Sequence, residues 1–274
     1  MKRVLAVGGS DSGGGAGIQA DIKTLHALGV HASTVVTAVT AQSSTAVQEV
    51  HVVPADVIAA QLQAVLLDIG ADIVKTGMLA TAEVVRLVAS AVDGIPLVVD
   101  PVGAASTGRS LLDPEGLRAL RDRLLPLATV VTPNLAEVEA LTGRVVTAER
   151  DLLDAAKAVR ALGPRWVLIT GGHLPGAPVD LLYDGSSAYA LRGTRIESRH
   201  THGSGCTLAS ALAGYLALGY DVPEAAKRAK QLTAGAIEHG YPLGAGPGPV
   251  RPGHTGGAAR ADGPAPPGGP SGPG

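Results

Sequence analysis

The single cysteine of the chain, Cys206, lies in the stretch THGSGCTLAS, directly after the turn Gly203-Ser204-Gly205. Apolar residues at helical spacing follow it, so a helix is predicted to begin here. Backbone N–H groups at a helix N-terminus lack intrahelical acceptors and attract anions, which makes residues 203–206 a candidate anion site. A thiol in that first turn is expected to have a lowered pKa and to suit a general base beside a phosphate. The alternative is a small buried cysteine that fills a gap between helix and sheet.

A glycine-rich loop at residues 8–17 invites comparison with nucleotide-binding motifs. It contains neither G-x-G-x-x-G nor G-x-x-x-x-G followed by Lys and Ser or Thr, so the dinucleotide and Walker A motifs are excluded. Its glycines, with Asp11 and Asp21 around them, favour a loop whose backbone approaches a small ligand over a plain strand-to-helix turn.

A zinc site is a further possibility, because His200 and His202 lie close to Cys206 in the sequence. Zinc would need a fourth ligand, and the chain has no other cysteine. Histidines at i and i+2 would also point to opposite sides of an extended segment, so zinc is disfavoured. No G-x-S-x-G motif is present, which excludes the nucleophile elbow of the hydrolases.

The elements that must position these residues alternate along the chain. Amphipathic helical stretches separate short apolar runs, and two long helices are expected at about 205–218 and 222–239. A hairpin is expected to turn at Asp184-Gly185. The strand candidates are residues 3–8, 33–39, 72–75, 96–100, 129–132 and 166–170. This pattern predicts an α/β fold of three layers, with a mostly parallel sheet and helices on both faces.

Polar residues gather where the predicted strands end. The strands run into GSDSGGGAG, TAQSS, KTGM, DPV, TPNLAE and TGGH. Turns require some of these residues. Ligands bind at the carboxyl edge of open parallel sheets, so the endings together favour a ligand-binding edge.

Composition sets the remaining bounds. The 274 residues are 46% hydrophobic with a net charge of −2, which leaves no basic footprint for nucleic acid, and no membrane segment is expected. One cysteine forms no intrachain disulfide, so a cytoplasmic location is expected. Residues 244–274 hold eleven of the 37 glycines and eight of the 19 prolines, which predicts a largely disordered tail after a single domain at 1–243.

At these residues the chain resembles the hydroxymethylpyrimidine/phosphomethylpyrimidine kinases of thiamine biosynthesis, within the ribokinase-like superfamily. The matching segments follow the family's order from residue 4 to about residue 242. They are AVGGSDSGGGAGIQADIKT, TAVTAQ, KTGMLA, DPV, TPNLAEVEALTG, ITGGHL and HTHGSGCTLASALA.

The resemblance implies an ATP-dependent kinase that phosphorylates 4-amino-5-hydroxymethyl-2-methylpyrimidine and then its monophosphate. Cys206 is the implied base for the substrate alcohol, with the N–H groups of Gly203, Ser204 and Gly205 as the anion hole for the phosphoryl group. A pyridoxal kinase of the same fold and a pyrimidine-binding module without turnover are the alternatives. A homodimer is also expected.

The resemblance also implies the contacts to the pyrimidine. Asp21 and Gln42 match positions that bind the aminopyrimidine, and Met78 and Val102 match apolar contacts to the ring. An amide offers a donor and an acceptor, which suits a ring nitrogen beside an amino group. A first-turn helix charge at Asp21 and a turn amide at Gln42 are the structural alternatives.

A second group of residues is implied to hold MgATP. Asn134 and Glu137 match the superfamily's Mg²⁺–phosphate motif, with the ion held through water, although a capping pair would look the same. Asp100 is a candidate for the outer sphere of the metal, and Thr170 and Gly172 are candidates for ATP.

The chain departs from the family's pattern at two places. Gly103 stands where relatives often have Met, which leaves the pocket less filled. Thr170 stands where relatives commonly have Lys. The sequence therefore predicts that a phosphate-contacting cation is missing or comes from elsewhere, with Lys75 and Arg109 as the candidates.

Overall fold

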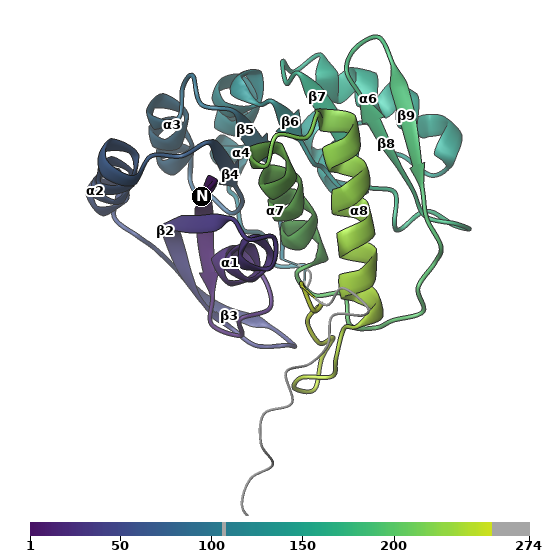
Figure 1. Ribbon diagram of the computed structural model, residues 1–274, viewed down its shortest axis with the longest axis horizontal. Helices are drawn as coiled ribbons and strands as arrows, with labels where there is room; N and C mark the ends of the chain where they lie inside the picture. The colour runs from purple at the N-terminus through teal and green to yellow at the C-terminus, as the bar shows by residue number, and fades with distance from the viewer. Residues whose placement is uncertain (106–107, 254–274) are drawn as a thin grey trace, which may run out of the picture.

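The computed structural model describes residues 1–105 and 108–253, and a nine-stranded sheet forms its middle layer (Figure 1). The strand order is β3-β2-β1-β4-β5-β6-β7-β8-β9. Strands β2, β1, β4, β5, β6 and β7 are parallel, whereas β3 and β8 run antiparallel to their neighbours. The strands are β1 (Arg3–Asp11), β2 (His31–Gln42), β3 (Val47–Val52), β4 (Ile73–Thr76), β5 (Leu97–Val99), β6 (Val130–Val131), β7 (Trp166–Ile169), β8 (Val179–Tyr183) and β9 (Ala188–Arg192).

Helices cover both faces of this sheet, which confirms the predicted three-layer α/β fold. One face carries α1 (Gly17–Ala27), α7 (Ser204–Ala217) and α8 (Val222–Glu238), which stand in front of the sheet in Figure 1. The other face carries α2 (Ala55–Ala64), η1 (Val65–Ile69), α3 (Ala82–Ala91), α4 (Pro114–Ala119), η2 (Leu120–Leu124), η3 (Leu125–Leu127), α5 (Leu135–Thr142), η4 (Glu149–Asp151) and α6 (Leu152–Arg160).

The apolar strands explain why both faces are covered. Along β5, the side chains of Leu97 and Val99 enter the core beneath α2–α6, and Val98 enters the core beneath α1, α7 and α8. Alternate residues of a strand point to opposite faces, so a continuous apolar run needs a helix layer on each side. Each buried apolar side chain of this size contributes about 1.5–3 kcal/mol.

All six predicted strands are present, and the hairpin expected at Asp184-Gly185 joins β8 to β9. Strand β3 was not predicted: its sequence VQEVHV pairs with β2 at the edge of the sheet. The two closing helices lie within one residue of their predicted bounds, at Ser204–Ala217 and Val222–Glu238.

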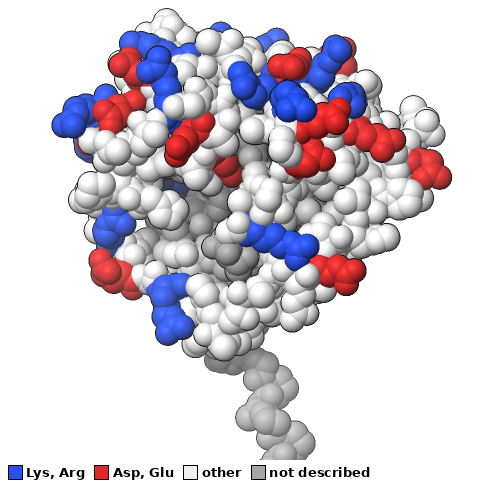
Figure 2. Space-filling model, turned by 180° about the vertical axis from the view of Figure 1, so that it is seen from behind, with Lys and Arg blue, Asp and Glu red and all other residues white. Residues whose placement is uncertain are grey.

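The outer surface of the α2–α6 face carries interleaved acidic and basic side chains. Figure 2 shows them over the upper part of this face, above a hollow with few charged side chains. Within the residues that the structure describes, no helix is long and apolar enough to cross a membrane.

The first ten residues of the predicted tail belong to the folded domain. Val250 is 3% exposed, and its N–H donates to the carbonyl of His202 at 3.0 Å. The N–H of Arg251 donates to Ala236, and the N–H of Gly246 donates to Ser44 Oγ at 3.1 Å. Residues 244–253, which the sequence assigns to the tail, are therefore held to the domain by backbone hydrogen bonds and by the buried Val250. Residues 254–274 lie outside the described residues.

Truncation separates these two parts of the C-terminal segment. Removal of residues 244–274 should lower Tm by at least about 4 °C, since several hydrogen bonds of about 1 kcal/mol each are lost together with a buried valine. Removal of residues 254–274 alone should leave Tm nearly unchanged, because the Gly- and Pro-rich composition of these residues supports no packed core. Thermal unfolding of both truncated chains tests this, and equal Tm values would contradict it.

Candidate active site

The loop after β1 is organised by the side chain of Asp11. Its carboxylate accepts hydrogen bonds from the N–H groups of Gly13, Gly15 and Ala16 at 2.8–2.9 Å. Burial alone would raise the pKa of Asp11, but hydrogen bonds from His202 and from these N–H groups hold it below its ordinary value. The carboxylate therefore folds the glycine-rich loop around itself at the carboxyl edge of the sheet.

The glycine turn before α7 packs directly against this loop. Gly203 has a φ of +82°, and a Cβ at this position would collide with the carbonyl oxygen of Gly15. Only glycine combines this backbone with so close an approach. The N–H of Ser204 donates to the carbonyl of Thr201 at 3.1 Å, so one of the three amides predicted as an anion hole already has a partner. The N–H of Gly205 lies in the first turn of α7, where helix geometry provides no acceptor.

Cys206 lies in the first turn of α7, as predicted, but its pKa differs from the expectation. Burial raises the pKa of the thiol from 9.0 to about 12. The ammonium of Lys75 opposes this, the carboxylates of Asp21 and Asp100 reinforce it, and the N–H of Gly17 lowers it slightly. The pKa is therefore raised and not lowered as predicted, because desolvation and the two nearby carboxylates outweigh the attraction of Lys75.

A buried ion pair lies beneath the thiol. Nζ of Lys75 on β4 lies 2.8 Å from Oδ1 of Asp21, and Ser210 Oγ donates to the same oxygen at 2.7 Å. The second oxygen of Asp21, Oδ2, is buried without a hydrogen-bond partner. Burial alone would lower the pKa of Lys75, but Asp21, Cys206 and Asp100 raise it, so the ammonium stays charged.

This geometry bears on three residues whose roles the sequence left open. Lys75 is fully buried and paired with Asp21, so it is not open to a phosphate. Arg109, the other candidate cation, donates through Nη1 to the carbonyls of Val47 and Gln48 at 2.8 and 2.6 Å. Asp21 is not an exposed first-turn charge either, since it is 0% exposed.

Two acidic side chains meet where β5 and β6 end. Glu137 and Asn134 form a capping box at the start of α5, with hydrogen bonds of 2.8 and 3.0 Å. Burial and the facing carboxylate of Asp100 raise the pKa of Glu137 to about 8, although N–H donors from Asn134 and Gly103 lower it. Burial also raises the pKa of Asp100 to about 6, against the attraction of Lys75. Asn134 and Glu137 thus form the capping pair that was the structural alternative. Glu137 and Asp100 also bring two acidic groups close together.

The segment after β7 lies beside this acidic pair. Thr170 forms a backbone bridge with Asn134, and a Cβ on Gly172 would meet no atom within 4 Å. The guanidinium of Arg195 donates to the carbonyls of Gly172 and Leu174 at 3.1 and 2.6 Å. Arg195 was not predicted from the sequence, since no motif surrounds it and only the fold brings it to this loop.

A hollow of about 280 Å³ opens between β3, the segment after β4 and the segment before α4, with both apolar and polar side chains in its lining. Met78 lines it, and Val102 packs into the same small apolar cluster. Gln42 ends β2, where Thr40 Oγ1 lies 3.2 Å from Oε1 of the amide. The amide Nε2 lies 3.4 Å from Nε2 of His202. The structure thus brings a ring-sized apolar surface and a polar amide to one edge of the sheet.

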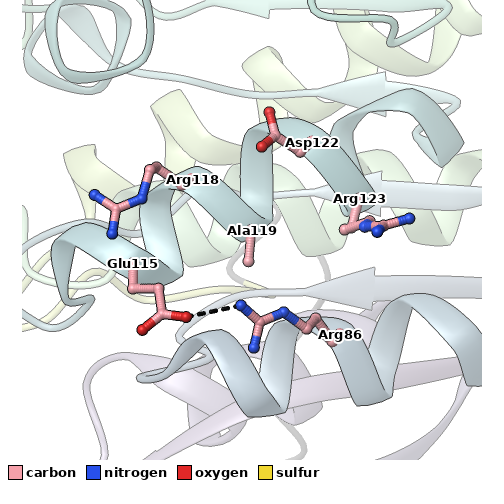
Figure 3. Close-up of a pocket in the computed structure, with 6 residues that line it drawn as sticks. All are labelled: Arg86, Glu115, Arg118, Ala119, Asp122 and Arg123. Atoms are coloured by element: carbon pink, nitrogen blue, oxygen red, sulfur yellow. Dashed lines mark hydrogen bonds and ion pairs between the residues drawn. The ribbon is translucent and has the colours of Figure 1, made fainter.

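Two other possible sites lack support. A hollow of about 290 Å³ lies on the helix layer between α3 and α4, where Arg86 pairs with Glu115 at 2.8 Å (Figure 3). It is lined by exposed charged side chains and by none of the predicted site residues. Over the part of the chain that the structure covers, no three His, Cys, Asp or Glu side chains are arranged for a metal, so zinc at His200, His202 and Cys206 is not supported.

The acidic pair predicts how stability depends on pH. A carboxyl whose pKa is raised from 4.5 to about 8 favours the folded state when protonated, so its contribution is lost as pH rises through about 8. Glu137→Gln keeps the capping acceptor and removes the charge. The fall in Tm from about pH 5 to about pH 8 should be smaller in Glu137→Gln than in wild type. Glu139→Gln, an exposed change on the same helix, serves as the control; an equal fall in wild type and Glu137→Gln would contradict the assignment.

Several known proteins are similar to this chain over most of its length. Hydroxymethylpyrimidine/phosphomethylpyrimidine kinase from Streptomyces coelicolor is 57% identical over 249 residues, covering 90% of this chain and 93% of the relative. An ADP complex of Bacillus subtilis pyridoxal kinase aligns with a TM-score of 0.87 at 40% identity, covering 92% of this chain and 97% of the other. Phosphomethylpyrimidine kinase from Clostridium difficile 630 aligns with a TM-score of 0.77 at 38% identity, covering 86% and 100%.

The family match covers most of the described residues. Residues 11–251 match the phosphomethylpyrimidine kinase family, a range that includes most of the glycine-rich loop, the acidic pair and the turn before Cys206. The chain belongs to the phosphomethylpyrimidine kinase family.

Proposed function

We propose that this chain transfers the γ-phosphoryl group of MgATP to 4-amino-5-hydroxymethyl-2-methylpyrimidine and then to the monophosphate, in thiamine biosynthesis. One observation carries the proposal: the end of β2 with Gln42, the glycine turn before α7 and the acidic pair after β5 and β6 all lie along the carboxyl edge of one parallel sheet. The names of its relatives from Streptomyces coelicolor and Clostridium difficile support the same activity.

Gln42 and Asp21 are proposed to recognise the aminopyrimidine. The amide of Gln42 offers one donor and one acceptor to a ring nitrogen and its neighbouring amino group. Oδ2 of Asp21 is a buried acceptor without a partner, and an amino group that reaches it gives this oxygen its missing donor. Met78 and Val102 provide the apolar surface for the ring.

Asp100, Asn134 and Glu137 are proposed to hold Mg²⁺ with ATP, partly through water. The donor set suits this ion, because Mg²⁺ is bound by one or two carboxylates together with phosphates and water. The raised pKa values of Asp100 and Glu137 indicate two facing carboxyls that a divalent cation would relieve. When bound, the ion neutralises charge on the transferring phosphates. Thr170 and Gly172 are proposed to contact ATP from the segment after β7.

Cys206 is proposed as the base for the substrate alcohol, with the amides of Gly203 and Gly205 holding the phosphoryl oxygens. The pKa of about 12 means that little thiolate exists at neutral pH. The nearby ammonium group of Lys75 favours the charged thiolate form of Cys206. The rate through this base should therefore increase with pH.

Pyridoxal kinase is the second candidate function, because the Bacillus subtilis pyridoxal kinase shares this fold with a TM-score of 0.87. A binding module without turnover is the third. A homodimer and a cytoplasmic location stay predictions.

Turnover of competing alcohols tests the proposed function. Wild type should consume ATP faster with the pyrimidine alcohol than with pyridoxine. Gln42→Ala should lower kcat/KM for the pyrimidine by the equivalent of about 1–3 kcal/mol, since a half-buried hydrogen-bonding group is lost, and should spare KM for ATP. Gln63→Ala, an exposed change on α2, is the control. Faster turnover of pyridoxine would favour pyridoxal kinase, and absence of turnover with both would favour the binding module.

Substitution of Cys206 tests the proposed base. Cys206→Ala should lower kcat by about 10²–10⁴ and leave ATP binding nearly intact. In wild type, kcat should rise between about pH 6 and about pH 9, because the thiolate fraction rises there. Cys206→Asp should recover part of the loss with a flatter profile. Near-normal kcat in Cys206→Ala would show that the amides and MgATP act without the thiol.

A further inference from the structure

The side chains of Asp11, His202 and Gln42 form a chain of contacts from the glycine-rich loop to the end of β2. Nε2 of His202 lies 3.2 Å from Oδ2 of Asp11 and 3.4 Å from Nε2 of Gln42. The side chains of His202 and Asp11 are 15% and 4% exposed. The proposed reaction gives His202 no role of its own.

His202 is held in place from several sides. Its backbone bonds to the C-terminal segment, where the N–H of Val250 donates to its carbonyl at 3.0 Å. Its ring occupies the space that a Cβ on Gly15 would fill, so the glycine permits the ring to approach the loop. A ring constrained in this way presents Nε2 to the same two neighbours.

The carboxylate of Asp11 determines whether Nε2 of His202 carries a hydrogen. The carboxylate of Asp11 accepts three backbone N–H bonds and has no hydrogen to give. A ring nitrogen of histidine either donates or accepts, and two lone pairs at 3.2 Å repel each other. Nε2 of His202 therefore carries a hydrogen and donates to Asp11.

His202 in turn determines the orientation of the Gln42 amide. The two ends of an amide have nearly the same shape, so the surrounding donors and acceptors decide which end faces which neighbour. With a hydrogen on Nε2, His202 has no lone pair there, so an amide NH₂ on that side would place donor against donor. The amide oxygen therefore faces His202 and shares its N–H with Asp11. The amide NH₂ then faces Thr40 Oγ1, which lies 3.2 Å from the other end of the amide and donates its own hydrogen to Ser10 at 3.1 Å. In this arrangement no donor faces another donor.

We propose that Asp11 and His202 are positioning residues that fix which end of the Gln42 amide is the acceptor oxygen and which end is the donor NH₂. This fixed orientation sets the preference of the site for an aminopyrimidine over a pyridine alcohol. An aminopyrimidine places an acceptor nitrogen beside a donor amino group, and pyridoxine lacks this adjacent pair. The inference rests on the proposed function and names the residues that select the substrate of the proposed reaction.

Two substitutions of His202 test this inference in the full chain. His202→Leu removes the donor, and His202→Gln keeps an N–H donor at similar reach. The measured quantity is kcat/KM for the pyrimidine alcohol divided by kcat/KM for pyridoxine, at saturating MgATP. This ratio should fall about tenfold in His202→Leu and recover to within about threefold of wild type in His202→Gln, as expected for one hydrogen bond. KM for ATP should change little. His26→Leu, an exposed change on α1, is the control.

A ratio in His202→Leu within about twofold of wild type, even with a lower kcat, would overturn the proposal and leave His202 a support for the loop. If His202→Leu does not fold, Thr40→Val removes the acceptor at the other end of the amide with little change in volume and should lower the same ratio. Calorimetric dissociation constants for both alcohols keep the two proposals separate. If wild type binds the pyrimidine but turns over neither alcohol, the proposed function fails, and the same variants still test the preference in binding.

Discussion

The buried ion pair between Lys75 and Asp21 is the interaction on which the site depends. The pair joins β4 to α1, and Ser210 of α7 donates a hydrogen bond to the same carboxylate oxygen of Asp21. Both charged side chains are 1% exposed, and removal of one partner from such a pair leaves an uncompensated charge that costs about 3–5 kcal/mol. The elements that carry the glycine-rich loop, the thiol and the end of β4 therefore meet at a fixed point.

The same pair governs the electrostatics around it. Lys75 attracts both the Cys206 thiolate and the Asp100 carboxylate, while burial opposes the charged form of each. Asp100 in turn raises the pKa of Glu137. Phosphoryl transfer depends mainly on position and charge, and the buried cation, the thiol and the acidic pair are linked in one electrostatic arrangement.

Much of the fold was predictable because its signals are local. Apolar runs and helical spacing located the strands and the closing helices, and the residues after each strand located the edge that carries the site. Strand β3 was missed because its side chains alternate at an exposed edge, with only Val47 fully buried. Residues 244–253 were assigned to a tail because composition counts apolar surface and ignores hydrogen bonds to Ser44, His202 and Ala236.

The sequence by itself determined the order of the elements, the glycine turn before Cys206 and the family, since these depend on residue types at short spacing. Only the tertiary structure decided what the titratable groups do. Lys75 and Asp21 are 54 residues apart, and Ser210 and Asp21 are 189 apart, so no local pattern pairs them. The pKa of Cys206 rises for the same reason: desolvation and the charges of Asp21 and Asp100 come from distant segments and outweigh the attraction of Lys75.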